Sequence, residues 1–253
     1  MTHRLLHSEI IGKGKPVVLV HGFLSSSHYF KTLRKQLARD HQVITIDLLG
    51  FGDSPKPKEY VSYDDQVHAI HETLLYLKIE QPFTLIGHSM GALVSLRYAN
   101  MYPDEVSSVQ LFNPPIFTTT EQAKDAFART NKGYNMLLHS PRRRVYWSLL
   151  KAMPRNIFQK RPEINVADTL RASRHAREGG YQRIILAAEL LDDLRRSTLP
   201  TLLVVGKYDR LVYQENLNQQ RLPENITIKI VETGHHTIAK TPELAEQLIR
   251  RSL

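Results

Sequence analysis

Short runs of apolar and β-branched residues recur along the chain and alternate with longer stretches of helical periodicity. Near-continuous apolar strands are typical of a parallel sheet covered on both faces, and strands that alternate with helices indicate βαβ units. The pattern therefore predicts an α/β fold, a mostly parallel sheet flanked by helices. Buried strands are expected at 16–22, 42–50, 83–89, 107–115, 201–209 and 226–234. Helices are expected at 25–40, 63–79, 90–101, 213–222 and 242–253, and one or two strands at 3–15.

The alternation breaks once, between the fourth and fifth of these strands. Helical patterns occupy this stretch, and it carries too many apolar residues, among them Phe127 and Trp147, for a linker. We expect residues 116–197, called the insertion below, to form a helical cap on a core made of 1–115 and 198–253. The helices are expected at 120–130, 142–153, 167–177 and 181–196.

Composition narrows the class of protein. Of 253 residues 42% are hydrophobic, which is enough for a substantial core, and the chain has no cysteine. Disulfides, thiolate metal sites and a cysteine nucleophile are therefore excluded. The first residues lack the apolar run of a signal peptide, and no stretch approaches the length of a membrane span. We expect a cytoplasmic protein.

The net charge of +9 is unevenly spread. Residues 115–200 hold 16 of the 34 Lys and Arg but only 8 of the 25 Asp and Glu. This excess fits a solvated helical surface, or attraction to anionic substrates or membrane headgroups. No nucleic-acid recognition motif accompanies it, so nucleic acid is not an expected partner.

The sequence Gly87-His88-Ser89-Met90-Gly91 has the spacing G-x-S-x-G. An apolar strand precedes it and an amphipathic helix follows, which is the setting of a nucleophilic serine on a sharp strand-to-helix turn. Glycines two residues to either side let strand and helix pass closely. We predict Ser89 as the nucleophile.

A serine hydroxyl needs a general base that a third group orients. In chain order an acid and then a histidine should follow at strand ends, and Asp209 and His235 stand there. Pro242, seven residues after His235, favours that histidine over His236. His88 is a less favourable base, because a neighbour of the serine in this turn faces away from it. Asp192 and Asp193 are less favourable acids, because they lie within a predicted helix.

The oxyanion of the transition state needs fixed donors, and backbone N–H groups serve best. Met90 follows the nucleophile at a helix N-terminus, and Phe23 lies in the loop after the 16–22 strand. We predict their N–H groups as the two donors. We expect His21, in the same loop, to orient it through hydrogen bonds.

Together the motifs "VVLVHGF", "ITIDLLGFGDSPKP", "LIGHSMGA", "VVGKYDRLV" and "TGHHTIAKTP" resemble the α/β-hydrolase superfamily, in its lidded branch of esterases and C–C-bond hydrolases. The resemblance implies that Ser89, Asp209 and His235 are nucleophile, acid and base. Serine at the turn argues against haloalkane dehalogenases and epoxide hydrolases, which use aspartate there. The turn of Asp47, Gly50, Gly52 and Ser54 looks like the structural "D-x-x-G-x-G-x-S" turn of the family.

The predicted function is therefore hydrolysis of small or medium carboxylic esters or thioesters through an acyl-enzyme. A C–C-bond hydrolase or lyase that uses the same residues on an anionic or diketone-like substrate is the alternative, and a non-catalytic ligand-binding protein is a lesser one. We expect no cofactor and no metal. The substrate-binding residues and the oligomeric state are not assigned by these patterns.

Overall fold

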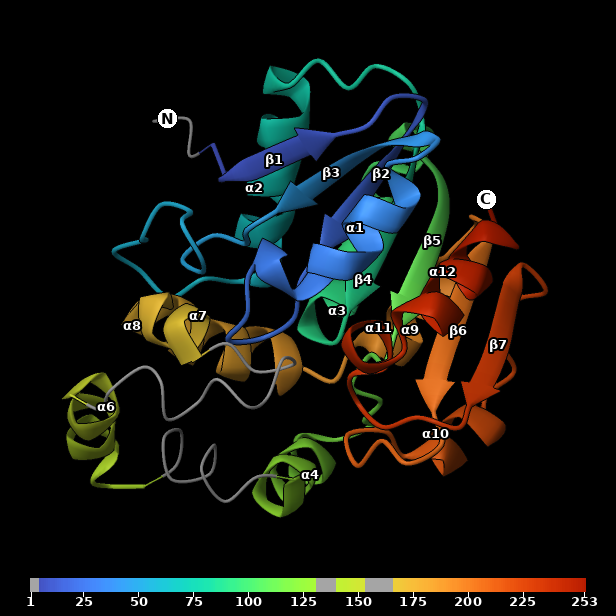
Figure 1. Cartoon of the computed structure of the whole chain (residues 1–253). Coiled ribbons are helices and arrows are strands. Elements are labelled where there is room, and N and C mark those ends of the chain that lie inside the picture. The colour runs from blue at the N-terminus through green and yellow to red at the C-terminus, as the bar shows by residue number, and fades with distance from the viewer. Residues whose placement is uncertain (1–4, 131–139, 153–165) are drawn as a thin grey trace.

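The computed structural model describes residues 5–130, 140–152 and 166–253. Its centre is a seven-stranded sheet of order β1-β3-β2-β4-β5-β6-β7, in which β1 is antiparallel to β3 and the other neighbours are parallel (Figure 1). This confirms the predicted α/β class. The strands are β1 Ser8–Ile11, β2 Lys15–Val20, β3 His41–Ile46, β4 Phe83–His88, β5 Val106–Phe112, β6 Thr201–Gly206 and β7 Ile226–Val231.

Helices cover both faces of the sheet. On one face α1 and α12 pack together, and apolar residues of β2, β4 and β6 form a core beneath them. On the other face α3 lies between α2 and α9 over a larger core. The bounds are α1 Lys31–Leu37, α2 Tyr63–Tyr76, α3 Met90–Met101, α9 Leu190–Arg196, α10 Gln214–Asn218, α11 Thr237–Lys240 and α12 Pro242–Arg250, with 3₁₀ turns η1 Ser27–Phe30 and η2 Pro103–Glu105.

The insertion begins after β5, and its helices at 120–130, 143–152, 166–171 and 174–179 lie beyond the carboxyl ends of the strands (Figure 1). The predicted helix at 167–177 is in fact two, because Ser173 turns out of the helix (ψ 155°) and its side chain caps the next one through Ala176 N–H. The predicted helix at 181–196 is likewise interrupted: the π-helical turn η4, Gly180–Ile185, is separated from α9 by Ala188, which has φ +56°. The remaining elements are α4 Thr120–Thr130, α6 Arg143–Ala152, α7 Val166–Arg171, α8 Arg174–Gly179 and η4 Gly180–Ile185. Residues 131–139 and 153–165 of the insertion lie outside the described part.

Two other predicted helices are shorter than expected. Residues 25–40 begin as loop and a 3₁₀ turn capped by the Ser26 side chain, so the α-helix starts only at Lys31. Residues 213–222 form only the short α10, which ends at Asn218.

Apolar residues on two elements differ in burial. On α2, Val67, Ile70 and Leu74 are buried, whereas Leu75 is 60% exposed. The β7 strand, predicted to be buried, is an edge strand with one neighbour, and its Ile230 is 56% exposed.

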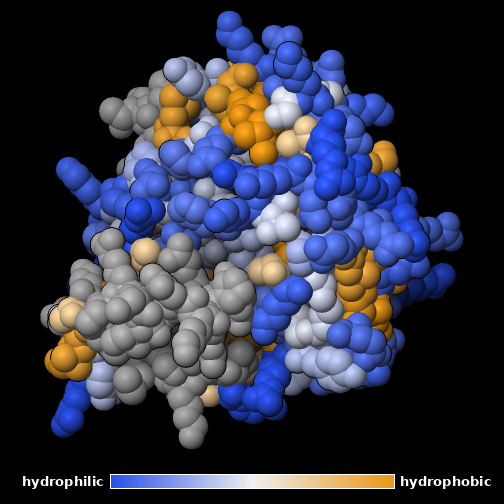
Figure 2. Space-filling model, viewed as in Figure 1, coloured by the Kyte–Doolittle hydropathy of each residue, from blue (hydrophilic) through white to orange (hydrophobic). Residues whose placement is uncertain are grey.

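The face shown in Figure 2 is mostly hydrophilic, with apolar side chains gathered in a few separate patches. Among the helices described, none has the length and apolar character needed to cross a bilayer.

Candidate active site

Ser89 occupies the sharp turn between β4 and α3, as the motif predicts. Its backbone has φ +55° and ψ −123°, a strained conformation for a residue with a side chain. Its N–H donates to the Phe112 carbonyl at 2.9 Å, which ties the turn to the neighbouring β5. A Cβ on Gly91 would come 2.3 Å from the His21 carbonyl oxygen, so glycine is needed for α3 to approach the loop after β2.

The structure brings together the three side chains that the sequence places far apart. His235 Nε2 lies 2.9 Å from Ser89 Oγ, and His235 Nδ1 lies 2.8 Å from Asp209 Oδ2. Because a carboxylate accepts, Nδ1 carries the proton and Nε2 accepts from the serine hydroxyl. This orientation is the one in which a histidine can take the proton of an attacking serine.

Asp209 is buried and held by three donors. Its Oδ2 atom accepts from His235 Nδ1 and from Asn113 Nδ2 at 3.2 Å, and its Oδ1 atom accepts from Leu211 N–H at 2.9 Å. Asn113 also donates to the Gly234 carbonyl at 3.1 Å, so one amide contacts the loops of both partners of Ser89. Asn113 was not predicted as a site residue, although its position directly after β5, at the edge where Ser89 stands, indicates one.

The other candidates lie outside this chain of hydrogen bonds. The His236 ring packs edge-on against the His235 ring, with centroids 5.2 Å apart, and near Tyr29, at 6.0 Å. Asp193, on α9, accepts a hydrogen bond from Arg97 Nε of α3 at 2.9 Å. The exposed Asp192 pairs with Arg195 of its own helix. Neither carboxylate contacts His235 in the described contacts, so the geometry favours Asp209.

His88 contacts the site through the backbone of the base. Its Nε2 atom donates to the His235 carbonyl at 2.8 Å, and its ring stacks on Tyr29 with centroids 4.2 Å apart. Burial, together with the nearby charges of His235 and His236, holds the pKa of His88 well below its usual value. The hydrogen bond to His235 was not expected from the sequence.

The loop after β2, residues 21–28, is called the β2 loop below. A Cβ on Gly22 would come 3.0 Å from Ser89 Cβ, so the loop passes directly over the serine. His21 Nδ1 donates to the Gly22 carbonyl at 2.8 Å, and its Nε2 accepts from Leu48 N–H at 2.9 Å. Burial lowers the pKa of His21, although the Asp47 carboxylate opposes this, and the neutral ring matches these two bonds. The expected orienting role of His21 agrees with them.

The two residues whose N–H groups are predicted to hold an oxyanion directly follow Ser89 and Gly22, the residue that passes over Ser89. Met90 is the first residue of α3, where N–H groups have no partner within the helix. Phe23 follows Gly22 in the β2 loop. Gly180 of the insertion lies against the side chains of both residues, since a Cβ there would come 3.1 Å from Met90 Sδ and 3.5 Å from the Phe23 ring.

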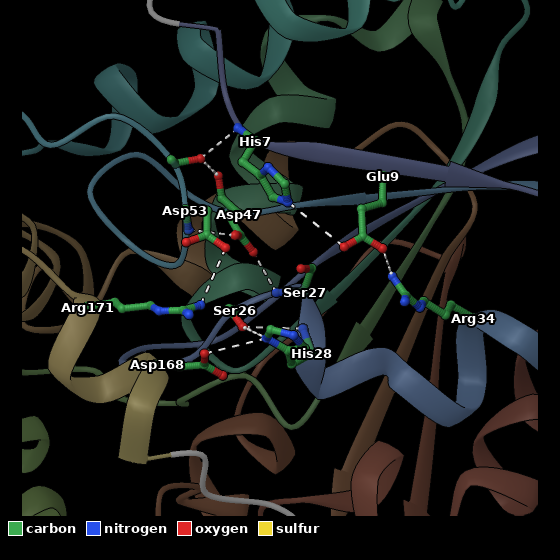
Figure 3. A network of polar contacts seen from close by, with 11 residues as sticks. His7, Glu9, Ser26, Ser27, His28, Arg34, Asp47, Asp53, Asp168 and Arg171 are labelled. Atoms are coloured by element: carbon green, nitrogen blue, oxygen red, sulfur yellow. Dashed lines mark hydrogen bonds and ion pairs between the residues drawn. The ribbon is translucent and has the colours of Figure 1, made fainter. Parts of the chain in front are cut away.

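One group of potential metal ligands occurs among the described residues. His7, Asp47 and Asp53 each place a ligand atom within 4.8 Å of the others (Figure 3). The Asp47 carboxylate accepts from Ser27 N–H at 2.6 Å and from Asp53 N–H at 2.9 Å. These bonds hold the 47–54 turn and the β2 loop, and we assign the cluster a structural role.

Comparison with known proteins decides the family. A profile described as alpha/beta hydrolase fold matches residues 15–241. The chain belongs to the α/β-hydrolase family. The solved esterase from Exiguobacterium antarcticum superposes on this α/β hydrolase with a TM-score of 0.74 and 23% identity, covering 98% of this chain and 95% of that one.

Two curated relatives add to this result. The pimeloyl-[acyl-carrier protein] methyl ester esterase of Aeromonas salmonicida is 24% identical over 96% of either chain. The Arabidopsis thaliana protein named "Probable lysophospholipase BODYGUARD 4" is 36% identical over 107 residues, 41% of this chain, and the match spans about a quarter (26%) of that protein. The family and these relatives support hydrolase activity for this α/β hydrolase.

Proposed function

We propose that the protein is a serine hydrolase of small or medium carboxylic esters or thioesters, with Ser89 as nucleophile, His235 as base and Asp209 as acid. The observation that carries the proposal is the chain of hydrogen bonds from Ser89 Oγ through the His235 ring to Asp209, at 2.9 and 2.8 Å. General-base help to a serine is what makes its hydroxyl reactive at neutral pH.

In the proposed reaction Ser89 Oγ attacks the ester carbonyl while its proton passes to His235 Nε2. Asp209 stabilises the resulting imidazolium and keeps the ring oriented. His235 then gives the proton to the leaving alcohol or thiol as the acyl–oxygen or acyl–sulfur bond breaks. Water, deprotonated by the same nitrogen, attacks the acyl-enzyme and releases the acid and Ser89.

We assign the Phe23 and Met90 N–H groups to the oxyanion. Support comes from the close passage of Gly22 over Ser89 and from the position of Met90 at the first turn of α3. Loss of one such donor typically costs about 2.7–4 kcal/mol in the barrier.

We further propose that the insertion, residues 116–197, caps the site on a core of 1–115 and 198–253. Phe23 packs near Tyr181, with ring centroids 6.5 Å apart, and Tyr181 meets Phe127 of α4 edge-on at 5.4 Å. Burial raises the pKa of Tyr181 to about 12, so its hydroxyl stays neutral beside this aromatic wall. An apolar wall next to the nucleophile favours the acyl part of a neutral ester.

The proposal is tested with p-nitrophenyl acetate, butyrate and octanoate and their thioester counterparts, assayed on the wild type and on Ser89→Ala. We expect hydrolysis of the shorter esters by the wild type and its loss in the variant. If all esters are inert while a vinylogous diketone is cleaved in a Ser89-dependent manner, the C–C hydrolase replaces the esterase. If neither class reacts, catalysis by this site is refuted.

A further inference from the structure

The β2 loop contains a backbone conformation that its own sequence does not favour. Leu24 has φ +56°, in the left-handed region that favours glycine, and it is buried at 3% exposure. A strained residue keeps such a conformation only when its surroundings hold it. Leu24 directly follows Phe23, whose N–H is assigned to the oxyanion.

The group that holds the Leu24 carbonyl comes from the insertion. Thr169 on α7 donates its hydroxyl to the Leu24 carbonyl oxygen at 3.2 Å, across 145 residues of chain. Thr169 is 5% exposed, so water does not readily replace this donor. The bond therefore fixes the peptide group that follows the strained residue.

The neighbouring residue of α7 contacts the far end of the same loop. Asp168 is 1% exposed, and its Oδ1 atom lies 3.5 Å from His28 Nδ1 (Figure 3). His28 is joined in turn to Ser26, whose hydroxyl lies 3.0 Å from His28 Nδ1 and accepts from His28 N–H at 3.3 Å. Two successive residues of α7 thus contact the β2 loop at Leu24 and at His28.

The core contacts the loop between these two points. Ser27 N–H donates to Asp47 Oδ1 at 2.6 Å, and Asp47 belongs to the turn after β3 (Figure 3). Arg171, at the end of α7, pairs with Asp53 of that turn at 3.4 Å, an exposed contact of small energetic weight. Asp168 and Thr169 are the two buried residues of α7 that contact the loop, Thr169 through a hydrogen bond and Asp168 at the half-exposed His28, with which it forms an ion pair when His28 is protonated.

We propose that Thr169 and Asp168 are positioning residues that hold the β2 loop so that the Phe23 N–H points at the oxyanion. This inference rests on the proposed serine hydrolase function. In this proposal α7 contributes to stabilisation of the transition state by positioning the β2 loop, in addition to any role in covering the substrate. Loss of the Thr169 and Asp168 contacts would weaken binding of the tetrahedral species and leave binding of the ground-state ester largely unchanged.

The test compares Thr169→Val, which keeps the shape and removes the donor, with Thr169→Ser, which restores it. We expect Thr169→Val to lower kcat about tenfold with KM within about twofold, a part of the loss that removal of an oxyanion donor produces. The affinity for a trifluoromethyl ketone, which forms a tetrahedral adduct with a serine, should fall by a similar factor. Thr169→Ser should recover most of both losses.

Thr120→Val is the matched control. Thr120 also lies in the insertion and donates its hydroxyl to a backbone carbonyl, that of Leu186 at 3.1 Å, but it does not contact the β2 loop in the described contacts. We expect it to change neither kcat nor the affinity for the ketone. Asp168→Asn provides a second test in case Thr169→Val does not fold, with an expected fall in kcat of about threefold or more.

The inference is overturned if folded Thr169→Val, or Asp168→Asn in its place, keeps wild-type kcat and wild-type ketone affinity. It is equally overturned if Thr120→Val shows the same losses, because the effect would then be general to the insertion. Retention of activity by Ser89→Ala would instead refute the proposed function itself, so the two failures are distinguishable.

Discussion

His88 donates a hydrogen bond from Nε2 to the backbone carbonyl of His235, at 2.8 Å. The residue before the candidate nucleophile is thereby bonded to the loop that carries the candidate base. Because a carbonyl only accepts, His88 holds its proton on Nε2, and its Nδ1 atom, 3.1 Å from the position of a Cβ on Gly22, has no hydrogen-bond partner in the described part of the chain. His88 is thus not placed to act as a base, and its hydrogen bond holds the loop of the candidate base His235.

Replacement of His88 by phenylalanine keeps an aromatic ring against Tyr29 and removes the donor. The His235 carbonyl would then be left without this partner, which costs about 1–3 kcal/mol in a buried setting. We expect kcat/KM for p-nitrophenyl butyrate to fall about tenfold, because part of that energy holds the His235 ring in place. Steady-state kinetics measure the change.

His71→Phe is the matched control for that variant. His71 also stacks on a tyrosine, Tyr102, at 3.9 Å, and contacts Glu105, but on the far helix α2. Its replacement should leave kcat/KM within about twofold. Equal losses in both variants would show that the His88 effect is not specific to the site.

Asn113 is expected to matter for kcat more than for KM. Its amide contacts Asp209 and the Gly234 carbonyl, and its φ of +51° suits Asn and Gly. Asn113→Gly removes the amide without adding backbone strain, and we expect kcat to fall about tenfold or more. Asn100→Ala is the control: it removes an amide that donates to the Asp193 carbonyl at 2.9 Å, and it should leave kcat unchanged. An unchanged kcat in Asn113→Gly would remove Asn113 from the site.

Stability should fall as the pH drops below about 6.5. Burial lowers the pKa of His21 and of His88 from the usual 6.5, so below that pH the unfolded chain binds protons that the folded chain does not. Each histidine contributes a loss of up to about 1.4 kcal/mol per pH unit until its folded-state pKa is reached. The two histidines therefore make their full contribution to the free energy of unfolding only above pH 6.5.

Denaturant unfolding at pH 5.5 and 7.5 measures this slope. The His88→Phe variant, which has one of the two groups removed, should lose less stability between these pH values than the wild type. A variant with the wild-type slope would contradict the assignment of His88 as a buried neutral histidine.

The close passage of α3 under the β2 loop predicts the effect of an added methyl group. In Gly91→Ala the new Cβ would meet the His21 and Val20 carbonyl oxygens at 2.3 and 2.4 Å, so backbone must shift. We expect a loss of about 2 kcal/mol or more in the free energy of unfolding. Gly234→Ala, whose Cβ would find its first neighbour at 3.9 Å, is the control and should cost less than about 1 kcal/mol. Similar costs would refute the close approach.

Much of this arrangement could be predicted because it depends on local patterns. The strand before Ser89 and the helix after it follow from apolar periodicity, and Asp209 and His235 follow from the meeting of parallel strands at one edge. The spacing to Pro242 favoured His235 over His236, and the predicted helix around Asp192 and Asp193 favoured Asp209. In the structure the hydrogen bonds join Ser89 to His235 and His235 to Asp209.

The remainder depends on contacts between distant segments. The bond from Thr169 to Leu24 spans 145 residues, and nothing in either local sequence indicates it. The break at Ser173 was missed because its cap competes with helical periodicity on both sides. The exposure of β7 was not predicted because the apolar sequence pattern of a strand is the same at the centre and at the edge of a sheet.

The central claim is that Ser89 is the nucleophile. Its most direct test is treatment of the folded protein with a fluorophosphonate, followed by peptide mass mapping. The account predicts a single adduct on Ser89, formed much more slowly in His235→Ala and absent in Ser89→Ala. An unlabelled wild type, or an adduct on another residue with Ser89 unmodified, would contradict it.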